Sequence, residues 1–157
     1  MSYEKVKEYL DSIGMGDRIV VRELTIDTVE HAAQSIGCEP KQIAKTMSFL
    51  HNDAPILIVM AGDAKVDNAK YKKYYKQKAA MIPFDRVEEL VGHAPGGVCP
   101  FAMKEGIKVY LDESLKRFDY VYAAGGNTSA TVKIAPHEFD TACPDSVWVD
   151  VCKGWQE

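Results

Sequence analysis

The sequence predicts one α+β domain, in which helices pack on a mixed or antiparallel sheet. Segments with helical and strand-like patterns are interspersed along the whole chain of 157 residues. Ile43–Leu50 and Pro55–Met60 have the pattern of two apolar strands, and the Asn-Asp pair at 52–53 between them predicts a β-hairpin. A hairpin is antiparallel, so a doubly wound parallel sheet is not expected. Because no linker, repeat or low-complexity tract divides the chain, residues 1–157 are expected to form a single domain.

Capping residues and the spacing of apolar side chains mark the helices. Ser2 is a suitable N-cap for the first helix, in which Val6 and Leu10 recur on one face. Thr28 is a suitable N-cap for the second helix, and Gly37 ends it. Helices or single helical turns are expected at 2–13, 28–36, Pro40, the lysine- and tyrosine-rich segment after Lys65, 85–91 with Asp85 as cap, 114–117 and Pro136.

Short runs of β-branched and aromatic residues, bounded by turn residues, predict the strands. The stretch 92–100 contains three glycines and two prolines, so it is expected to be a loop. Strands are expected at 19–24, 43–50, 55–60, 78–82, 108–111, 120–124, 130–134 and 147–151.

Composition and charge exclude several classes of protein. The chain is 46% hydrophobic and 27% charged, which is ordinary for a soluble domain, and no apolar run approaches the ~20 residues that span a membrane. The charged N-terminus does not resemble an export signal, so we expect a cytoplasmic protein without membrane association. The net charge of −4 argues against non-specific binding to DNA.

Cysteine, histidine and glycine spacings predict neither a metal nor a cofactor. None of the four cysteines belongs to a CxxC pair, and they are expected to be reduced thiols. The four histidines show neither HxxxH nor HxH spacing, so no metal site is expected. The glycines fit neither GxGxxG nor GxxxxGK(S/T), which leaves no support for a nucleotide cofactor.

The segment from Lys65 to Lys78 is strongly basic. It contains six lysines and a single acid, with three tyrosines among them. The favoured interpretation of its fold is an amphipathic helix whose tyrosines pack inward and whose lysines face solvent. Such a helix can also present phosphate-binding cations, so an RNA ligand stays open. The lysines considered for contact with RNA are Lys70, Lys72, Lys73 and Lys76.

Two glycine doublets, Gly96-Gly97 and Gly125-Gly126, are the most informative local features. Glycine has no Cβ, so a ligand can approach the main chain closely and successive N–H groups can point at one spot. Such a loop can hold a carbonyl oxygen or a phosphate with the backbone alone. No nucleophile–base set stands out beside the doublets, so any chemistry there is expected to depend on positioning.

Two side chains near these features have more than one interpretation. Cys99 is a nucleophile only if its loop folds back and brings His93 within reach; otherwise it is a small residue packed under the loop, which is the favoured interpretation. Lys45 lies in an apolar strand, where simple alternation would point it to solvent. The alternative is a cation that projects into a pocket and meets an anion.

Four blocks in order make the chain similar to a known family. They are Thr28–Gly37, Ile43–Met47, Gly92–Phe101, and Ala124–Asn127 leading into Thr131–Ile134, and Asp112 falls at the family's spacing after the proline loop. The chain resembles the YbaK/prolyl-tRNA-synthetase-associated domain family of free-standing aminoacyl-tRNA editing deacylases. The resemblance covers residues 25–139.

The resemblance implies a curved, mostly antiparallel mixed sheet flanked by helices and a hydrolase that removes an amino acid from mischarged tRNA. Lys45 would anchor the phosphate or ribose at the tRNA 3′ end, and Gly96 and Gly97 would hold the aminoacyl carbonyl through their N–H groups. Water, or the substrate's own hydroxyl or thiol, would attack. The implied partners are aminoacyl-tRNA, above all tRNA(Pro), and prolyl-tRNA synthetase. The residues expected to bind the substrate are Thr46, Cys99, Pro100, Gly125, Gly126 and Asn127.

Two positions depart from the family pattern and bear on specificity. Cys99 stands where many relatives have serine, and Thr46 stands where alanine-editing members tend to have asparagine. The second departure favours cysteine or another small amino acid as the one removed. Two other functions stay open: a tRNA- or synthetase-binding accessory protein without turnover, and a thiol hydrolase that uses Cys99.

Overall fold

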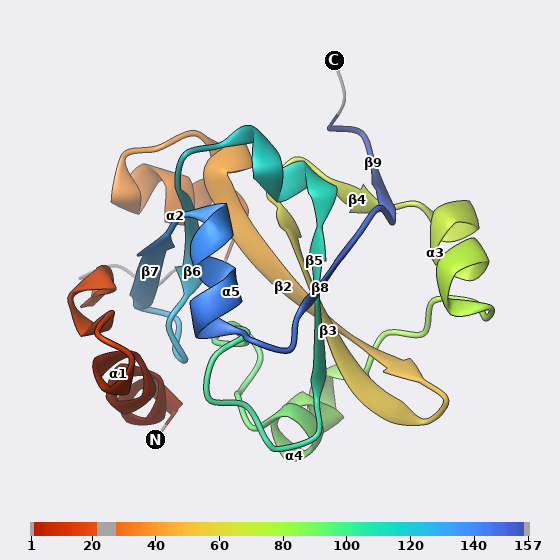
Figure 1. Ribbon diagram of the computed structural model, residues 1–157, viewed down its shortest axis with the longest axis horizontal. Helices are drawn as coiled ribbons and strands as arrows, with labels where there is room; N and C mark the ends of the chain where they lie inside the picture. The colour runs from red at the N-terminus through yellow and green to blue at the C-terminus, as the bar shows by residue number, and fades with distance from the viewer. Residues whose placement is uncertain (1, 22–27, 156–157) are drawn as a thin grey trace.

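A seven-stranded mixed sheet forms the centre of the computed structural model, which describes residues 2–21 and 28–155 (Figure 1). The strand order is β1-β7-β6-β2-β3-β5-β8, and β4 and β9 form a separate two-stranded sheet. The strands are β1 (Ile19–Val21), β2 (Ile43–His51), β3 (Ala54–Ala61), β4 (Lys65–Val66), β5 (Lys108–Asp112), β6 (Val121–Ala124), β7 (Ala130–Ile134), β8 (Val147–Val149) and β9 (Cys152–Lys153).

The predicted fold class is confirmed. The pairs β1–β7, β7–β6 and β2–β3 are antiparallel, whereas β6–β2, β3–β5 and β5–β8 are parallel. The longest ladder is antiparallel: β2 and β3 pair from Ala44↔Ala61 to His51↔Ala54 and form the predicted hairpin. Both turn residues have positive φ, 51° at Asn52 and 65° at Asp53, as expected for a tight two-residue hairpin turn.

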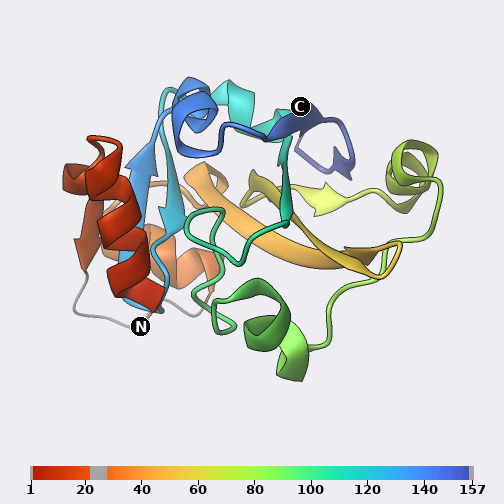
Figure 2. The same cartoon turned by 60° about the horizontal axis from the view of Figure 1, so that its bottom comes forward.

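The helices cover both faces and one end of the sheet (Figures 1 and 2). On one face, α1 and α5 lie together, and the Tyr9 hydroxyl of α1 donates to the Ala142 carbonyl of α5 at 2.6 Å. On the other face, α2 packs on Ile43 in an apolar cluster separate from the main core. The helix α3 lies at the far end of the molecule from α2. The helices are α1 (Ser2–Ser12), α2 (Val29–Ile36), α3 (Asn68–Tyr75), α4 (Val87–Val91) and α5 (Phe139–Ala142).

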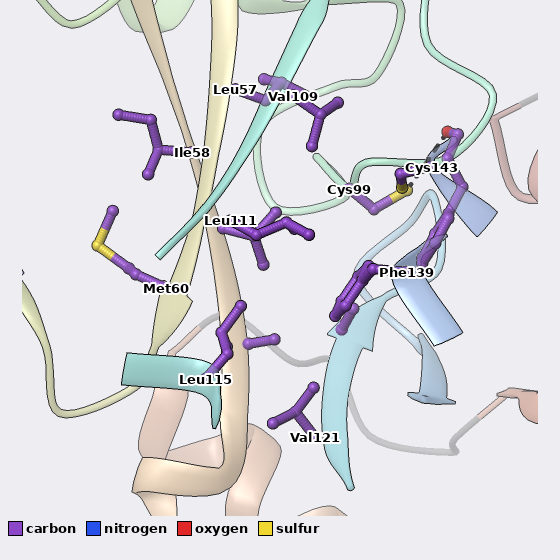
Figure 3. Packing of buried hydrophobic residues seen from close by; sticks show 14 of the residues in the cluster. Leu57, Ile58, Met60, Cys99, Val109, Leu111, Leu115, Val121, Phe139 and Cys143 are labelled. Atoms are coloured by element: carbon purple, nitrogen blue, oxygen red, sulfur yellow. Dashed lines mark hydrogen bonds between the residues drawn. The ribbon is translucent and has the colours of Figure 1, made fainter. Parts of the chain in front are cut away.

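The predicted cap and stop explain where α2 begins and ends, whereas Ser2, predicted to cap the first helix, is already part of α1, and its hydroxyl donates to the Gly92 carbonyl at 3.2 Å. The Thr28 hydroxyl accepts a hydrogen bond from the His31 N–H, and Gly37 ends α2 with φ 86°. In α1, Val6 and Leu10 are fully buried, as their spacing predicts. Strand β3 lies near the middle of the sheet, and its residues 56–61 are buried, which is why it is a continuous apolar run. Its Leu57, Ile58 and Met60 are part of the main core in Figure 3.

Two predicted elements are wrong in their details. Residues 78–82 form no regular strand: they approach β2 through a single bridge, Met81↔Phe49, with flanking hydrogen bonds. Asp85 does not cap a helix; it lies inside a 3₁₀ turn, Phe84–Arg86, and α4 begins only at Val87. The preceding Pro83 explains the late start, because it favours extended backbone before the turn. The part of the first predicted strand at 22–24 lies outside the described residues.

The C-terminal strand is also shorter than predicted, because Asp112 and Val151 interrupt it. β8 ends at Val149, and the Val151 N–H donates to Asp112 Oδ1 at 3.0 Å instead of continuing the ladder. The Val151 carbonyl accepts from the Asp67 N–H at 2.8 Å. The chain then pairs β9 with β4, a short ladder that the sequence patterns do not predict.

Replacing Asp112 by alanine is expected to destabilise the fold. The carboxylate is fully buried and accepts from the N–H groups of Ser114 at 2.9 Å and Val151 at 3.0 Å. Leaving these donors unpaired should cost about 2–3 kcal/mol of unfolding free energy, measured by urea denaturation. The exposed Asp140→Asn serves as the control and should change it by less than about 0.5 kcal/mol. Equal stabilities of the two variants would contradict this prediction.

Candidate active site

A pocket opens where the parallel strands β2 and β6 stop pairing. Their ladder consists of Ile43↔Tyr122 and Ala44↔Ala123 and then ends. Because the strands are parallel, their next residues lie at the same edge: Lys45 on β2, and Ala124 followed by the second glycine turn on β6. Strand β6 ends there, whereas β2 continues to His51, so the two chains diverge and leave room for a ligand at the carboxyl end of β6.

The pocket has a volume of about 340 Å³ and a largely apolar lining. Its floor comes from β2, β6 and β7, and one wall is the inner face of α2, with Val29, Ala32 and Ile36. The loop that carries Pro95, Gly96 and Val98 also lines the pocket. The remaining lining residues are Thr28, 43–48, Met81, Val87, 122–124, Asn127, Ala130 and Thr131.

Lys45 lines this pocket and does not simply point to solvent. Its Nζ donates to the Gly62 carbonyl at 3.4 Å. Burial lowers the pKa of its ammonium group, because little solvent is present to stabilise the charge. The Gly62 carbonyl can reach this position since Gly62 packs directly on Pro40, where a Cβ would lie 2.0 Å from the Pro40 carbonyl oxygen. A partly desolvated cation of this kind is suited to bind an anionic or polar ligand.

Thr46 adds a polar atom to the same pocket. Its hydroxyl oxygen is buried and has no hydrogen-bond partner within the described part of the chain. It also lines the cavity. A buried hydroxyl without a partner is costly, so a ligand that bonds to it would gain affinity.

The first glycine doublet forms a turn whose amides have different partners. Pro95 precedes Gly96, which has φ 92°, and the Gly97 N–H donates to the Ala94 carbonyl at 3.0 Å. Proline followed by a positive-φ glycine is typical of a type II turn. The Gly97 amide is therefore used inside the turn. Gly96 and Val98 both line the pocket. Their N–H groups donate no hydrogen bond to any of the described residues.

Gly97 and the second glycine doublet pack backbone against backbone. A Cβ on Gly97 would lie 2.6 Å from the Gly126 carbonyl oxygen, so only glycine fits there. Gly126 itself has φ 95° and lies against the backbone of Ser2. Gly125 packs on Ala130, whose carbonyl accepts from the Gly125 N–H at 2.9 Å. The two doublets therefore act first as the contact that holds two loops together.

Asn127 stabilises the second turn from within. Its Oδ1 accepts from the N–H groups of Ser129 and Ala130, both at 2.8 Å. It also lines the pocket. The side chain therefore fixes the shape of the turn that borders the pocket.

Cys99 and Pro100 do not line the pocket. Cys99 is fully buried below the loop, next to Cys143 at one end of the core (Figure 3). The loop does fold back, since His93 Nε2 lies 3.6 Å from Cys99 Sγ. However, Nε2 must carry a proton because it donates to the Phe101 carbonyl at 2.7 Å, so it cannot accept one from the thiol. Burial raises the pKa of Cys99 to about 12, which further disfavours a thiolate.

The four lysines predicted for RNA contact differ in their surroundings. Lys70 Nζ is paired with Asp150 Oδ1 and the Cys152 carbonyl, both at 3.0 Å, and so ties α3 to the C-terminal segment. Lys72, Lys73 and Lys76 are exposed. None of the four lines the pocket, because α3 lies at the far end of the sheet. The tyrosines do pack inward as predicted, with Tyr71 and Tyr75 buried.

Several pocket residues escape the sequence patterns. The apolar face of α2 and Met81 belong to the lining, although their spacing alone indicates ordinary core or surface residues. Gly62, whose carbonyl accepts a hydrogen bond from Lys45, is a lone glycine that belongs to no motif. Within the described ranges, no group of three histidine, cysteine, aspartate or glutamate side chains could hold a metal ion, and no helix could cross a membrane.

Fold and pocket together define a class of protein: a small α+β domain with a half-buried lysine and two packed glycine turns at one strand edge. A family model described as an aminoacyl-tRNA editing domain matches residues 24–142. The chain therefore belongs to the aminoacyl-tRNA editing domain family, which confirms the resemblance noted from its motifs.

The chain is also similar to individual proteins and to a solved structure. The chain is 40% identical over 157 residues to the uncharacterized protein YwhH of Bacillus subtilis strain 168, covering 99% of this chain and 100% of the relative. It is 30% identical over 95 residues to proline–tRNA ligase of Limosilactobacillus fermentum, covering 57% of this chain but only 17% of the ligase. A solved structure of a proposed trans-editing enzyme for prolyl-tRNA synthetase superposes with a TM-score of 0.87 at 29% identity, covering 98% of both chains.

Proposed function

We propose that the protein is a trans-editing deacylase that hydrolyses mischarged aminoacyl-tRNA in the cytoplasm, with tRNA(Pro) carrying cysteine or another small amino acid as its substrate. The observation that carries the proposal is the meeting of Lys45, Gly96 and Asn127 in one largely apolar pocket. The family membership and the similarity to a proposed trans-editing enzyme support it. The match to part of a proline–tRNA ligase supports tRNA(Pro).

The proposed reaction relies on positioning. The ester carbonyl oxygen would accept hydrogen bonds from the N–H groups of Gly96 and Val98, which stabilise the negative charge that develops on it. Water, or the substrate's own thiol or hydroxyl, attacks the carbonyl carbon. The bond to the ribose oxygen then breaks, and that oxygen takes up the proton given up by the attacking water, thiol or hydroxyl, so that it leaves as a ribose hydroxyl. Lys45 would hold the ribose or the phosphate of the terminal nucleotide.

The size and lining of the pocket support a small amino acid. A cavity of about 340 Å³ must hold the aminoacyl group and part of the ribose. The apolar α2 wall suits a short side chain, and the unpartnered Thr46 hydroxyl can bond to a thiol, a hydroxyl or the α-amino group. A large side chain would compete with the ribose for the space, and a charged side chain would lie against the apolar wall without a partner for its charge.

A deacylation panel tests the proposal. tRNA(Pro) would be charged separately with Cys, Ala, Ser, Thr and Pro, and release of each amino acid would be measured. We expect rapid loss of cysteine or of another small residue, with Pro-tRNA(Pro) spared. Binding of charged tRNA without release of any amino acid would instead identify a non-catalytic accessory protein.

Replacing Cys99 by serine is expected to leave most of the deacylation rate. The thiol lies outside the pocket and has no available base, and a serine hydroxyl can also donate to the Phe101 carbonyl that Sγ bonds at 3.6 Å. Single-turnover deacylation should fall by less than about tenfold, a decrease that small shifts of the loop would explain. A folded Cys99→Ser protein that has lost nearly all activity would establish a thiol hydrolase instead.

Neutralising the exposed lysines of α3 tests their proposed contact with the tRNA backbone. Lys72→Ala combined with Lys73→Ala should raise KM and leave kcat nearly unchanged, because α3 lies away from the pocket. The slope of log affinity against log salt should fall by roughly 0.7–0.9 for each lost phosphate contact. Lys41→Ala, a partly exposed lysine in the turn before β2 that pairs with Glu39 at 3.6 Å, is the control. A slope equal to that of the unmodified protein would leave α3 as a solvated helix only.

A further inference from the structure

Two exposed apolar side chains lie in the pocket lining or next to it in the chain. Phe84 is 79% exposed and Met81 is 58% exposed. Met81 lines the pocket, and so does Val87 at the start of α4. Phe84 lies three residues from each of them, and in helical geometry it neighbours Val87, one turn away. Phe84 therefore lies next to a residue that lines the pocket, on the segment between α3 and α4 that Figure 2 shows below the sheet.

This exposure is not explained by packing. Phe84 does not belong to either apolar cluster of the described residues, and Met81 does not either. The other large exposed apolar side chains lie elsewhere, on β1, on α3 and at Tyr120, and none of them lines the pocket. A single exposed aromatic residue is common on a protein surface, but one placed near an exposed apolar residue that lines a pocket indicates a ligand.

We propose that Phe84 and Met81 form a stacking platform for the terminal base of the unpaired RNA 3′ end. The inference rests on the proposed function, because an aminoacyl ester is attached to the ribose that also carries this base. If the ester lies inside the pocket, the base must lie at its mouth. An aromatic side chain is the group that proteins use to hold an unpaired base without reading its sequence.

Charges around the platform agree with a neutral base as the ligand. Lys78 and Arg86 are exposed and have no ion pair among the described residues, so they can meet the phosphates of the preceding nucleotides. Three carboxylates lie close by in the sequence, at Asp85, Glu88 and Glu89. Their negative charges would repel a phosphate that lay directly over α4, but they would not repel the uncharged face of a base. The strand would thus approach from the side of residues 78–81.

The test measures binding of uncharged RNA, so that its outcome does not depend on turnover. The probe is an RNA hairpin with an unpaired 3′ end whose terminal adenine is replaced by 2-aminopurine, a base whose fluorescence is quenched by stacking. We expect quenching by the unmodified protein and by Phe84→Trp. Phe84→Ala should abolish the quenching and weaken binding roughly five- to one-hundred-fold. Tyr120→Ala, an exposed aromatic outside the pocket, is the matched control and should change neither.

A second RNA, with an abasic terminal nucleotide, allows a double-mutant cycle between Phe84 and the terminal base. It should bind the unmodified protein about as weakly as the full RNA binds Phe84→Ala, and Phe84→Ala should not weaken it further. Equal losses for both RNAs, or no binding of either RNA by the unmodified protein, would overturn the platform. Deacylation with unchanged quenching in Phe84→Ala would overturn the platform and leave the proposed function standing. The expected quenching without deacylation of any charged tRNA would support the platform and overturn the proposed deacylase function.

Discussion

Lys45→Ala is expected to abolish deacylation and to leave the fold intact. The lysine provides the cation that lines the pocket beside Thr46 and the glycine loop. Loss of one well-placed donor at an active site lowers the rate by about 10²–10³-fold. The fold should persist, because Lys45 is not part of either apolar cluster and its Nζ has one long hydrogen bond, 3.4 Å to the Gly62 carbonyl.

The measurement is single-turnover deacylation beside urea unfolding of the same variant. Unfolding free energy should change by less than about 1 kcal/mol, because removing a partly desolvated charge offsets the lost packing of its methylene groups. Lys65→Ala, an exposed lysine on β4, is the matched control and should keep its activity. Turnover by a folded Lys45→Ala protein at the unmodified rate would remove Lys45 from the active site.

Gly97→Ala should lower kcat severely while tRNA affinity is mostly kept. The added methyl group would lie 2.6 Å from the Gly126 carbonyl oxygen and 2.8 Å from the Asn127 nitrogen, so the two glycine turns must move apart. Gly96 and Val98, the proposed donors to the ester carbonyl, would move with their loop. A displacement of about 1 Å at a reacting centre can cost on the order of 10² in rate, and the strain costs about 1–3 kcal/mol of stability.

Gly106→Ala separates this effect from general backbone strain. Gly106 has φ 86° with no atom within 4 Å of the position of a Cβ, so alanine there strains the backbone but displaces no neighbour. It should cost stability without lowering kcat. If Gly97→Ala instead loses tRNA binding while the rate on bound substrate survives, the loop holds the tRNA and not the reacting ester, and the positioning mechanism is wrong.

Local features of the fold followed from sequence because each rests on neighbouring residues. The Thr28 cap, the Gly37 end of α2 and the turn at 52–53 lie where their chemistry predicts. The start of α4 differs for a local reason, the preceding Pro83, whereas the end of the last strand is decided by a distant contact. Asp112 ends the last strand early by accepting from the Val151 N–H, 39 positions further along the chain.

The candidate site shows the same division. By itself, the sequence determined the types of residue available: a lysine in an apolar strand, two glycine doublets, and the family motif in which they occur. It could not show that the Gly97 N–H donates to the Ala94 carbonyl inside its own turn. Nor could it show that Cys99 is buried below the loop and does not line the pocket. Both facts depend on how the loop folds back on itself and on the core.

Only the tertiary structure decided that these residues meet. Parallel pairing of β2 with β6 places Lys45 and the second glycine turn at one edge, although about 80 residues separate them in the chain. Packing of Gly97 on Gly126 then holds the first glycine loop against the second. Patterns of period two or 3.6 report which face of a strand or helix is buried, but they carry no record of which strand lies beside which. That choice is made by packing across the whole sheet, and it is what turns scattered residues into a pocket.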